Sequence, residues 1–257
     1  MSNVSVSLDG VSVSFPIGRR AGGRCFTALH DISLSVERGQ KLGVIGRNGS
    51  GKSTLLRLIA GTIHPDGGQI TRNHGACQLL SLGLGFVPHL NGRDNAILSA
   101  LYQGVSYRRI LDRIDAIREF SELGEFFDQP INTYSSGMRA RLGISVALQM
   151  EPDILLLDEV LGVGDPAFRE KSRNAIRSRL RSDATVVLVS HDEKTITDFC
   201  PRVAWLDGGR IVACGETEEV LREYSDAGKS MVATRAEKSP RAEGIAQPGA
   251  KLGRSAK

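Results

Sequence analysis

The chain has 257 residues, 40% of them hydrophobic, a length that suits one α/β domain with a helical insertion and leaves little room for two full domains. Its longest apolar stretches, ILLL at 154–157 and TVVLV at 185–189, fall far short of the roughly 20 residues of a membrane span, and no signal-peptide pattern opens the chain, which predicts a soluble intracellular protein. The net charge is +4, but residues 229–257 carry seven Lys or Arg and two Glu, so residues 1–228 carry −1 and give no reason to expect a nucleic-acid partner.

The N-terminal part of the chain predicts strands that lead into a glycine-rich loop. NVSVSLDGVSVSF alternates apolar and polar residues on both sides of Asp9 and Gly10, which is typical of a β-hairpin. After a Gly/Arg-rich segment, HDISLSVERG predicts a further strand. The short apolar strand LGVIG then runs through RNGSGKST into a helix, whose leucine-rich face ends at Gly61.

The middle of the chain predicts helices, and the part after it predicts strands again. From about Pro88 to Met150, segments such as SYRRILDRIDAIREFSEL favour helices with polar faces, and we expect a helical subdomain over about residues 88–150. DILLLDE and TVVLVSH are continuous apolar runs, typical of parallel strands buried on both faces. RVAWLDGGRIVAC predicts a closing hairpin that turns at residues 207–209. The fold class is therefore α/β.

The C-terminal segment, residues 226–257, differs from the rest in composition. It lacks aromatic residues and any apolar period, so we expect a basic, disordered tail. Such a tail either contacts anionic lipid headgroups or is a solvated end without a role. The cysteines are expected to be reduced thiols, because their spacing fits no zinc site: Cys25, Cys77, Cys200 and Cys214.

A phosphate-binding motif follows the strand LGVIG. The segment matches G-x-x-x-x-G-K-[ST] at every fixed position and lies between a strand and a helix. Its backbone N–H groups are expected to wrap the β-phosphate, Lys52 to reach the β- and γ-phosphates, and the Ser53 hydroxyl to bind Mg²⁺. The nucleotide-binding residues are Gly46, Arg47, Asn48, Gly49, Ser50, Gly51, Lys52, Ser53 and Thr54.

Two further groups follow the apolar strands of the second half. Asp158 ends ILLLD, where a carboxylate is costly to bury unless it serves a cation, so we expect it to bind Mg²⁺. Glu159 comes next and is the expected general base for the attacking water, although an acidic pair at a strand end can also cap a helix. His191 follows VVLVS; alone it is ambiguous, but the end of a second parallel strand favours a γ-phosphate sensor.

A second anion site is predicted at YSSGMRARL. A Ser-Ser-Gly turn there precedes a basic amphipathic helix, and the start of a helix favours negative charge. The chain already has one phosphate loop, so a second site needs a reason.

In this order and at these spacings, GRNGSGKST, YSSGMRARL, LLLDEVLGVGD and VSH resemble the ATP-binding subunit of ABC transporters over roughly residues 3–225. The resemblance implies a P-loop NTPase core with a mixed sheet, an N-terminal antiparallel β-subdomain and the helical insertion, in a nucleotide-binding domain of residues 1–225. It implies ATP hydrolysis with ATP and Mg²⁺ as cofactors. In that family the serine-glycine turn contacts ATP held by a second subunit. Ser135 and Gly137 would therefore face the partner's phosphate loop in a homodimer, with Asp165 across the same interface.

Within that family, FVPHLNGRDN, YSSGMRARL and DEVLGVGDPAFREK resemble the polysaccharide-export group. This implies export of capsule, O-antigen or teichoic acid chains through two copies of a separate permease, and a peripheral place on the cytoplasmic face of the bacterial inner membrane. No sugar-binding residue can be identified, so the cargo rests on resemblance. The alternatives are another ABC importer or a drug or lipid exporter, a soluble ABC ATPase acting on ribosomes or DNA, and a nucleotide-locked regulatory subunit without turnover.

At two positions of the family pattern, the sequence does not decide which residue corresponds. Most ABC subunits have a glutamine a few residues before the segment corresponding to FVPHL; here Ser81 or Leu82 is near that place, and Gln78 lies slightly too early. The family's adenine-stacking aromatic corresponds better to Phe15 than to Phe26, although a phenylalanine that ends a strand is often a core residue.

Overall fold

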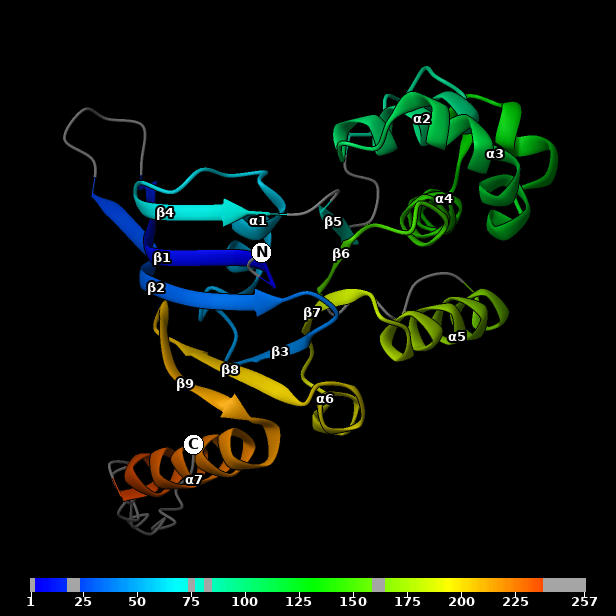
Figure 1. The fold of residues 1–257 in the computed structure, drawn as a ribbon. Helices are drawn as coiled ribbons and strands as arrows, with labels where there is room; N and C mark the ends of the chain where they lie inside the picture. Colours follow the sequence, from blue (N-terminus) through cyan, green and yellow to red (C-terminus); the bar gives the residue numbers. More distant parts are fainter. Residues whose placement is uncertain (1–2, 18–23, 74–76, 81–84, 159–164, 238–257) are drawn as a thin grey trace, which may run out of the picture.

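The structure, a computed structural model, describes residues 3–17, 24–73, 77–80, 85–158 and 165–237, with side chains up to residue 228. Figure 1 shows two sheets, with a group of helices beyond one edge of the larger sheet. The strands are β1 (Val4–Pro16), β2 (Cys25–Glu37), β3 (Lys41–Ile45), β4 (Gly67–Arg72), β5 (Cys77–Leu80), β6 (Ile154–Asp158), β7 (Thr185–Val189), β8 (Arg202–Asp207) and β9 (Arg210–Glu216). The helices are α1 (Lys52–Ala60), α2 (Gly92–Tyr102), α3 (Tyr107–Ser121), α4 (Ser136–Gln149), α5 (Pro166–Arg181), α6 (Glu193–Phe199) and α7 (Thr217–Glu237), with short 3₁₀ turns at Gly124–Asp128 and Ile131–Thr133.

The larger sheet is mixed, as expected. Its strand order is β5-β6-β7-β3-β8-β9, and every neighbouring pair is parallel except β8 and β9. The apolar runs of β6 and β7 are buried on both faces, which explains why neither alternates. One face packs with α1 against the N-terminal sheet, and α4, α5, α6 and α7 contribute buried side chains to the other. The closing hairpin is confirmed as β8 and β9.

The smaller sheet is antiparallel, with the order β2-β1-β4. The hairpin predicted at Asp9 and Gly10 is wrong, because β1 continues through both residues. Leu8 pairs with Leu34 and Val11 with Ile32, so two residues of β1 oppose one of β2 and form a β-bulge. Gly10 has a φ of 59°, the left-handed conformation that glycine also supplies in tight turns.

The helical insertion is confirmed as α2, α3 and α4, which have a hydrophobic core of their own. We call this cluster the helical-subdomain core. It is formed in part by a stripe of α3 at helical spacing, Ile110, Ile114 and Ile117, together with Phe127 and Leu142. The cluster is distinct from the two clusters on the faces of the larger sheet.

The C-terminal helix α7 runs from Thr217 to Glu237 and so crosses the expected boundary between residues 225 and 226. Disorder was expected across 226–257, but the backbone is helical as far as Glu237, so that expectation is wrong for residues 226–237. Residues 238–257 lie outside the described part. Among the described residues, the structure contains no helix with the length and hydropathy that crossing a membrane requires.

Candidate functional site

The phosphate loop between β3 and α1 is closed tightly around its glycines. Gly46, Gly49 and Gly51 have φ values of 149°, 80° and 105°, which side chains with a Cβ rarely adopt. A Cβ on Gly46 would lie 2.0 Å from the carbonyl oxygen of Leu206, and one on Gly51 would lie 2.7 Å from that of Ala28. The loop conformation therefore requires glycine for reasons within the chain itself.

The start of α1 is arranged to receive an anion. Its N-cap is Gly51, no side chain caps its first turn, and that turn contains no acidic residue. Lys52 is 7% exposed, and its Nζ donates to the carbonyl oxygens of Gly46 at 2.8 Å and Arg47 at 3.0 Å, so its charge lies within the loop. The Ser50 hydroxyl is buried without a hydrogen-bond partner among the described residues. A phosphate fits this uncapped, positively charged helix start.

The register of the sheet brings three strand ends together. Asp158 at the end of β6 pairs with Val189 at the end of β7, and Val189 pairs with Val44 of β3, just before the loop. Neighbouring strands lie about 5 Å apart, so these ends form one edge. His191 follows β7 and is exposed; it lines a groove of about 460 Å³ together with Arg173 and other residues of α5 and α6. Glu159 lies outside the described residues.

The serine-glycine turn is the start of α4. Ser135 is the N-cap, and its hydroxyl accepts a hydrogen bond of 3.2 Å from the Met138 N–H. Gly137 is partly exposed in the first turn, and a Cβ there would meet nothing closer than 3.7 Å. The turn opens into a groove of about 1110 Å³, whose lining, as far as the structure describes it, includes residues 135–141 but none of residues 46–54. The two predicted anion sites are therefore separate within one chain.

Asp165 is engaged within its own chain. It is the N-cap of α5, where its Oδ1 accepts a hydrogen bond of 3.0 Å from the Phe168 N–H, and its Oδ2 pairs with Arg141 of α4. The hydrogen bond from Phe168 and then the one from Arg141 lower the pKa of Asp165 to about 2. Its expected place across a subunit interface stays a prediction. Sequence reasoning missed Arg141, although its position four residues after Gly137 is a signal, because such residues share a helix face.

The two candidate adenine-stacking rings lie opposite each other. Phe15 of β1 pairs directly with Phe26 of β2, so their side chains share one face of the sheet. Phe15 is 39% and Phe26 is 52% exposed, so neither is a core residue. The preference for Phe15 stays a prediction, since the register gives both rings the same place.

Gln78 does not reach the edge formed by the strand ends. It pairs with Leu155 in β6, three residues before Asp158, and is 1% exposed. Its amide nitrogen and oxygen have no hydrogen-bond partner among the described residues. The chain therefore differs from the common glutamine pattern at this point. Ser81 and Leu82 lie outside the described residues.

Comparison with known proteins identifies relatives of this chain. Residues 29–162 match the family model described as ABC transporter. The O-antigen export system ATP-binding protein RfbB of Klebsiella pneumoniae is 44% identical over 205 residues, which cover 80% of this chain and 83% of that protein. The teichoic acids export ATP-binding protein TagH of Staphylococcus epidermidis is 38% identical over 234 residues, covering 86% of this chain and 88% of that protein.

The fold is also found among solved structures. The dimeric ATP-binding cassette MJ0796, in a post-hydrolysis state bound to ADP and Pi, superposes with a TM-score of 0.66 at 23% identity and covers 82% of this chain and 98% of its own. The P-loop NTPase fold expected from the motifs is thereby confirmed. The relatives confirm the resemblance to the ATP-binding subunits of polysaccharide exporters. The chain is an ABC ATPase and belongs to the family of ATP-binding subunits of ABC transporters.

Proposed function

We propose that this chain is the ATP-hydrolysing subunit of a transporter that exports a cell-surface polysaccharide across the bacterial inner membrane. It works as a homodimer on the cytoplasmic face, bound peripherally to two copies of a separate permease. The observation that carries the proposal is the separation of the phosphate loop from the serine-glycine turn within one chain. A second copy of the chain brings the two together and completes each nucleotide site.

The phosphate loop supplies most of the binding groups for ATP. The N–H groups of residues 46–54 surround the phosphates, and the Lys52 ammonium neutralises the β- and γ-phosphate oxygens. The Ser53 hydroxyl is exposed beside the loop, and the Asp158 carboxylate ends a neighbouring strand, so both suit Mg²⁺, which prefers oxygen ligands. An Mg²⁺ ion held by Ser53 and Asp158 would neutralise charge that develops on the phosphate oxygens.

Two residues complete the hydrolytic site in this proposal. Glu159 accepts a proton from the attacking water, and His191, from the adjacent strand end, contacts the γ-phosphate. Glu159→Gln is expected to bind ATP and trap a dimer, because closure needs binding while reopening needs hydrolysis. A Glu159→Gln variant that hydrolyses ATP at the wild-type rate would exclude the assigned base.

The presence of glycine at position 137 is an argument for a ligand that comes from outside the chain. Glycine in a helix is less stable than alanine by about 1 kcal/mol, yet among the described residues no atom lies closer than 3.7 Å to the place of a Cβ at Gly137. The close approach of a phosphate explains why the position is glycine. Ser135 and Gly137 then contact the γ-phosphate held by the partner subunit, so binding of ATP closes the dimer.

The cargo is proposed from the relatives. The names of RfbB and TagH specify O-antigen and teichoic acids, which are both surface polymers. Deletion of the gene in its own host is expected to leave lipid-linked glycan inside the cell and remove it from the surface. The wild-type gene should restore the surface glycan, and the Lys52→Ala gene should not. An unchanged surface coat would exclude this cargo, but it would not contradict the assignment of the chain as an ATPase.

The dimeric site has a direct test by complementation. Lys52→Ala removes the phosphate-binding cation, and Ser135→Arg blocks the serine-glycine turn, so each variant alone should lack hydrolysis while Ser135→Arg still binds nucleotide. A mixed dimer contains one complete site, formed by the loop of one variant and the turn of the other. Equal mixing should therefore restore about a quarter of the wild-type rate, since half of the dimers are mixed.

Ser106→Arg is the matched control for this experiment. Ser106 is also an exposed N-cap serine, at the start of α3, and its side chain makes no capping hydrogen bond. The control should hydrolyse ATP at the wild-type rate. A mixture of Lys52→Ala and Ser135→Arg that stays as inactive as the separate variants would refute the site between subunits.

A further inference from the structure

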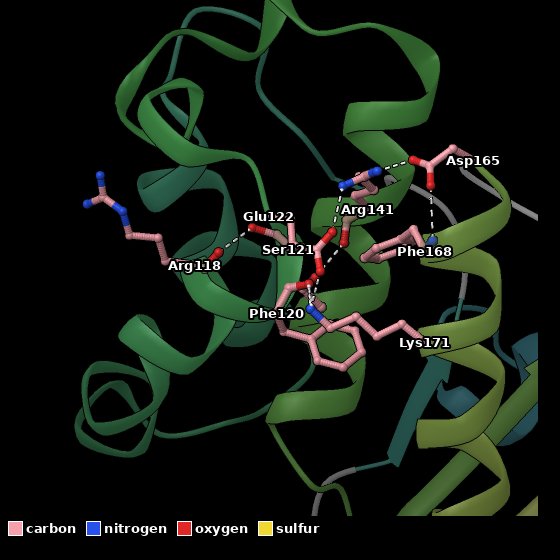
Figure 2. A network of polar contacts seen from close by, with 9 residues as sticks. Arg118, Phe120, Ser121, Glu122, Arg141, Asp165, Phe168 and Lys171 are labelled. Carbon is pink, nitrogen blue, oxygen red and sulfur yellow. Dashed lines mark hydrogen bonds and ion pairs between the residues drawn. The ribbon is translucent and has the colours of Figure 1, made fainter.

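Four charged side chains form a network where the helical subdomain meets the core (Figure 2). Arg141 of α4 pairs with Asp165 and, through Nη1, with the Glu122 carboxylate at 3.3 Å. The other oxygen of Glu122 accepts a hydrogen bond of 2.6 Å from Nζ of Lys171 in α5. Positive and negative charges alternate along the network, and both of its ends, Asp165 and Lys171, belong to the beginning of α5. Three helices are thus held by one set of ion pairs.

Glu122 reaches two cations because of its backbone conformation. It is the C-cap of α3 and has a φ of 53°, in the left-handed region that non-glycine residues seldom adopt. The carboxylate is directed between Arg141 and Lys171, and each cation takes one oxygen (Figure 2). The hydrogen bond from Lys171 is the largest cause of its lowered pKa, so Glu122 is ionised at neutral pH.

Two aromatic rings hold the cations in place. The Arg141 guanidinium lies 4.8 Å from the centre of the Phe168 ring, and Nζ of Lys171 lies 4.7 Å from that of Phe120. The two rings themselves meet edge to face at 5.9 Å. Cations over aromatic faces are attracted by the ring quadrupole, and the rings exclude water from one side of the network. Each of the two cations is therefore held both by its carboxylate partner and by an aromatic ring.

The network connects the two parts of the proposed hydrolytic machinery. Arg141 lies four residues after Gly137, on the same face of α4 as the serine-glycine turn. Asp165 follows the strand-end carboxylate Asp158 by seven residues along the chain. The ion pair between Arg141 and Asp165 thus joins the helix of the serine-glycine turn to the start of α5, whose Phe168 lies in the same hydrophobic cluster as Leu157 of β6.

We propose that Arg141 is a positioning residue for ATP hydrolysis. Through Asp165 and Glu122 it fixes the serine-glycine turn relative to the strand end of the same subunit, so that the two nucleotide sites of a dimer close together. This inference rests on the proposed function, because the position of the turn affects hydrolysis only if the turn serves the partner's nucleotide. Arg141 touches no reacting atom in this role.

Full-length Arg141→Gln tests the inference by separating binding from turnover. We expect the kcat for ATP to fall about 10- to 100-fold, as for a group displaced by a fraction of an ångström to one ångström. The affinity for a fluorescent ATP analogue should stay within about threefold, since the phosphate loop is untouched. Arg141→Lys should recover part of the kcat, because it keeps the charge but loses the second hydrogen bond.

Arg118→Gln is the matched control. Arg118 also makes an ion pair, with Asp128 at 2.8 Å, and also lies over a ring, that of Phe127 at 5.6 Å, but all three residues belong to the helical subdomain. Its loss should leave kcat unchanged. An Arg141→Gln protein with wild-type kcat, or an equal loss of kcat in Arg118→Gln, would overturn the inference.

Glu122→Gln provides a second variant, which keeps the shape of the side chain. It should lower kcat less than Arg141→Gln, and the double variant should be no slower than Arg141→Gln alone, because both changes act on one network. Losses that simply multiply in the double variant would contradict a shared network. Absence of hydrolysis in the wild-type protein would refute the proposed function, whereas an active wild type beside a fully active Arg141→Gln refutes this inference alone.

Discussion

Two glycine-bearing helix starts in this protein look alike in sequence and differ in what surrounds them. At the start of α1, Gly46 and Gly51 have positive φ values, and a Cβ on either would clash with a backbone carbonyl oxygen of the same chain. At the start of α4, the Cβ of an alanine at Gly137 would meet no atom of the described residues closer than 3.7 Å. The fold requires the first set of glycines and leaves the last one unexplained.

This contrast separates two reasons for a glycine. At the phosphate loop, neighbouring atoms of the same chain require it, so the shape of the loop belongs to the fold. At the serine-glycine turn, glycine lowers helix stability and no described atom requires it, as the proposed ligand from a second subunit predicts. Gly46→Ala and Gly137→Ala, each with a control substitution, test this distinction, and Asp165→Asn tests a smaller effect beside the serine-glycine turn.

Gly46→Ala should break the first site and the fold together. The new Cβ would lie 2.0 Å from the Leu206 carbonyl oxygen, and φ at 149° is unfavourable for alanine. We expect the free energy of unfolding to fall by more than about 3 kcal/mol, in the range of severe backbone clashes. Denaturant unfolding measures this loss.

Gly49→Ala controls for backbone strain in the same loop. Gly49 also has a positive φ, 80°, but its Cβ would have nothing within 4 Å. The free energy of unfolding of Gly49→Ala should fall by only about 1–2 kcal/mol, the strain of a left-handed residue. Equal losses in the two variants would show that strain, and not the clash with Leu206, makes glycine necessary.

Gly137→Ala should have opposite effects on stability and on activity. The free energy of unfolding should rise by up to about 1 kcal/mol, because alanine favours the helix. Hydrolysis should fall by roughly 100-fold, as when one preorganised contact to the transferred phosphate is lost. Gly228→Ala in α7 is the control, since its Cβ would also meet no described atom within 4 Å; it should raise stability without loss of hydrolysis. Full hydrolysis in Gly137→Ala would remove the case for an external ligand at this turn.

Asp165→Asn should have the smallest effect on stability, and that effect should depend on pH. The folded-state pKa of Asp165, about 2, lies below its ordinary value, so the ionised carboxylate stabilises the fold above the unfolded-state pKa. Asparagine is also a good N-cap, so the substitution removes mainly the charge beside Arg141. The Tm difference between wild type and Asp165→Asn should be constant from about pH 7 to 5 and should disappear between about pH 4 and 2. A difference that persists unchanged at pH 2 would show that the charge is not its cause.

Local patterns predicted much of the fold correctly. The leucine-rich face of α1, the buried strands β6 and β7 and the closing hairpin follow from periodicity and turn residues alone. The bulge at Gly10 could not be predicted in this way, because a left-handed glycine between alternating segments suits a hairpin and a bulge equally well. Pairing with β2 and β4, which are distant in sequence, decides between them.

In the candidate site, too, the local motifs could be predicted from the sequence and the contacts between distant residues could not. The order of motifs indicated the phosphate loop, the strand-end carboxylate and the serine-glycine turn, and register places Asp158 beside the end of β7. The network around Arg141 could not be predicted, since it joins residues 24 and 49 positions apart in sequence. It also depends on the left-handed backbone of Glu122, which no pattern in the sequence signals.

The separate hydrophobic core of the helical subdomain has a consequence for local unfolding. Because α2 and α3 pack around their own cluster, they can unfold as one cooperative unit while both sheets stay intact. Their amide protons then exchange with solvent together, and at a lower free energy than those of β6 and β7, whose strands are buried on both faces. Proteases cleave such partly open forms, so we expect limited proteolysis to cut first in the helices around Phe127 and later in the sheet that holds the phosphate loop.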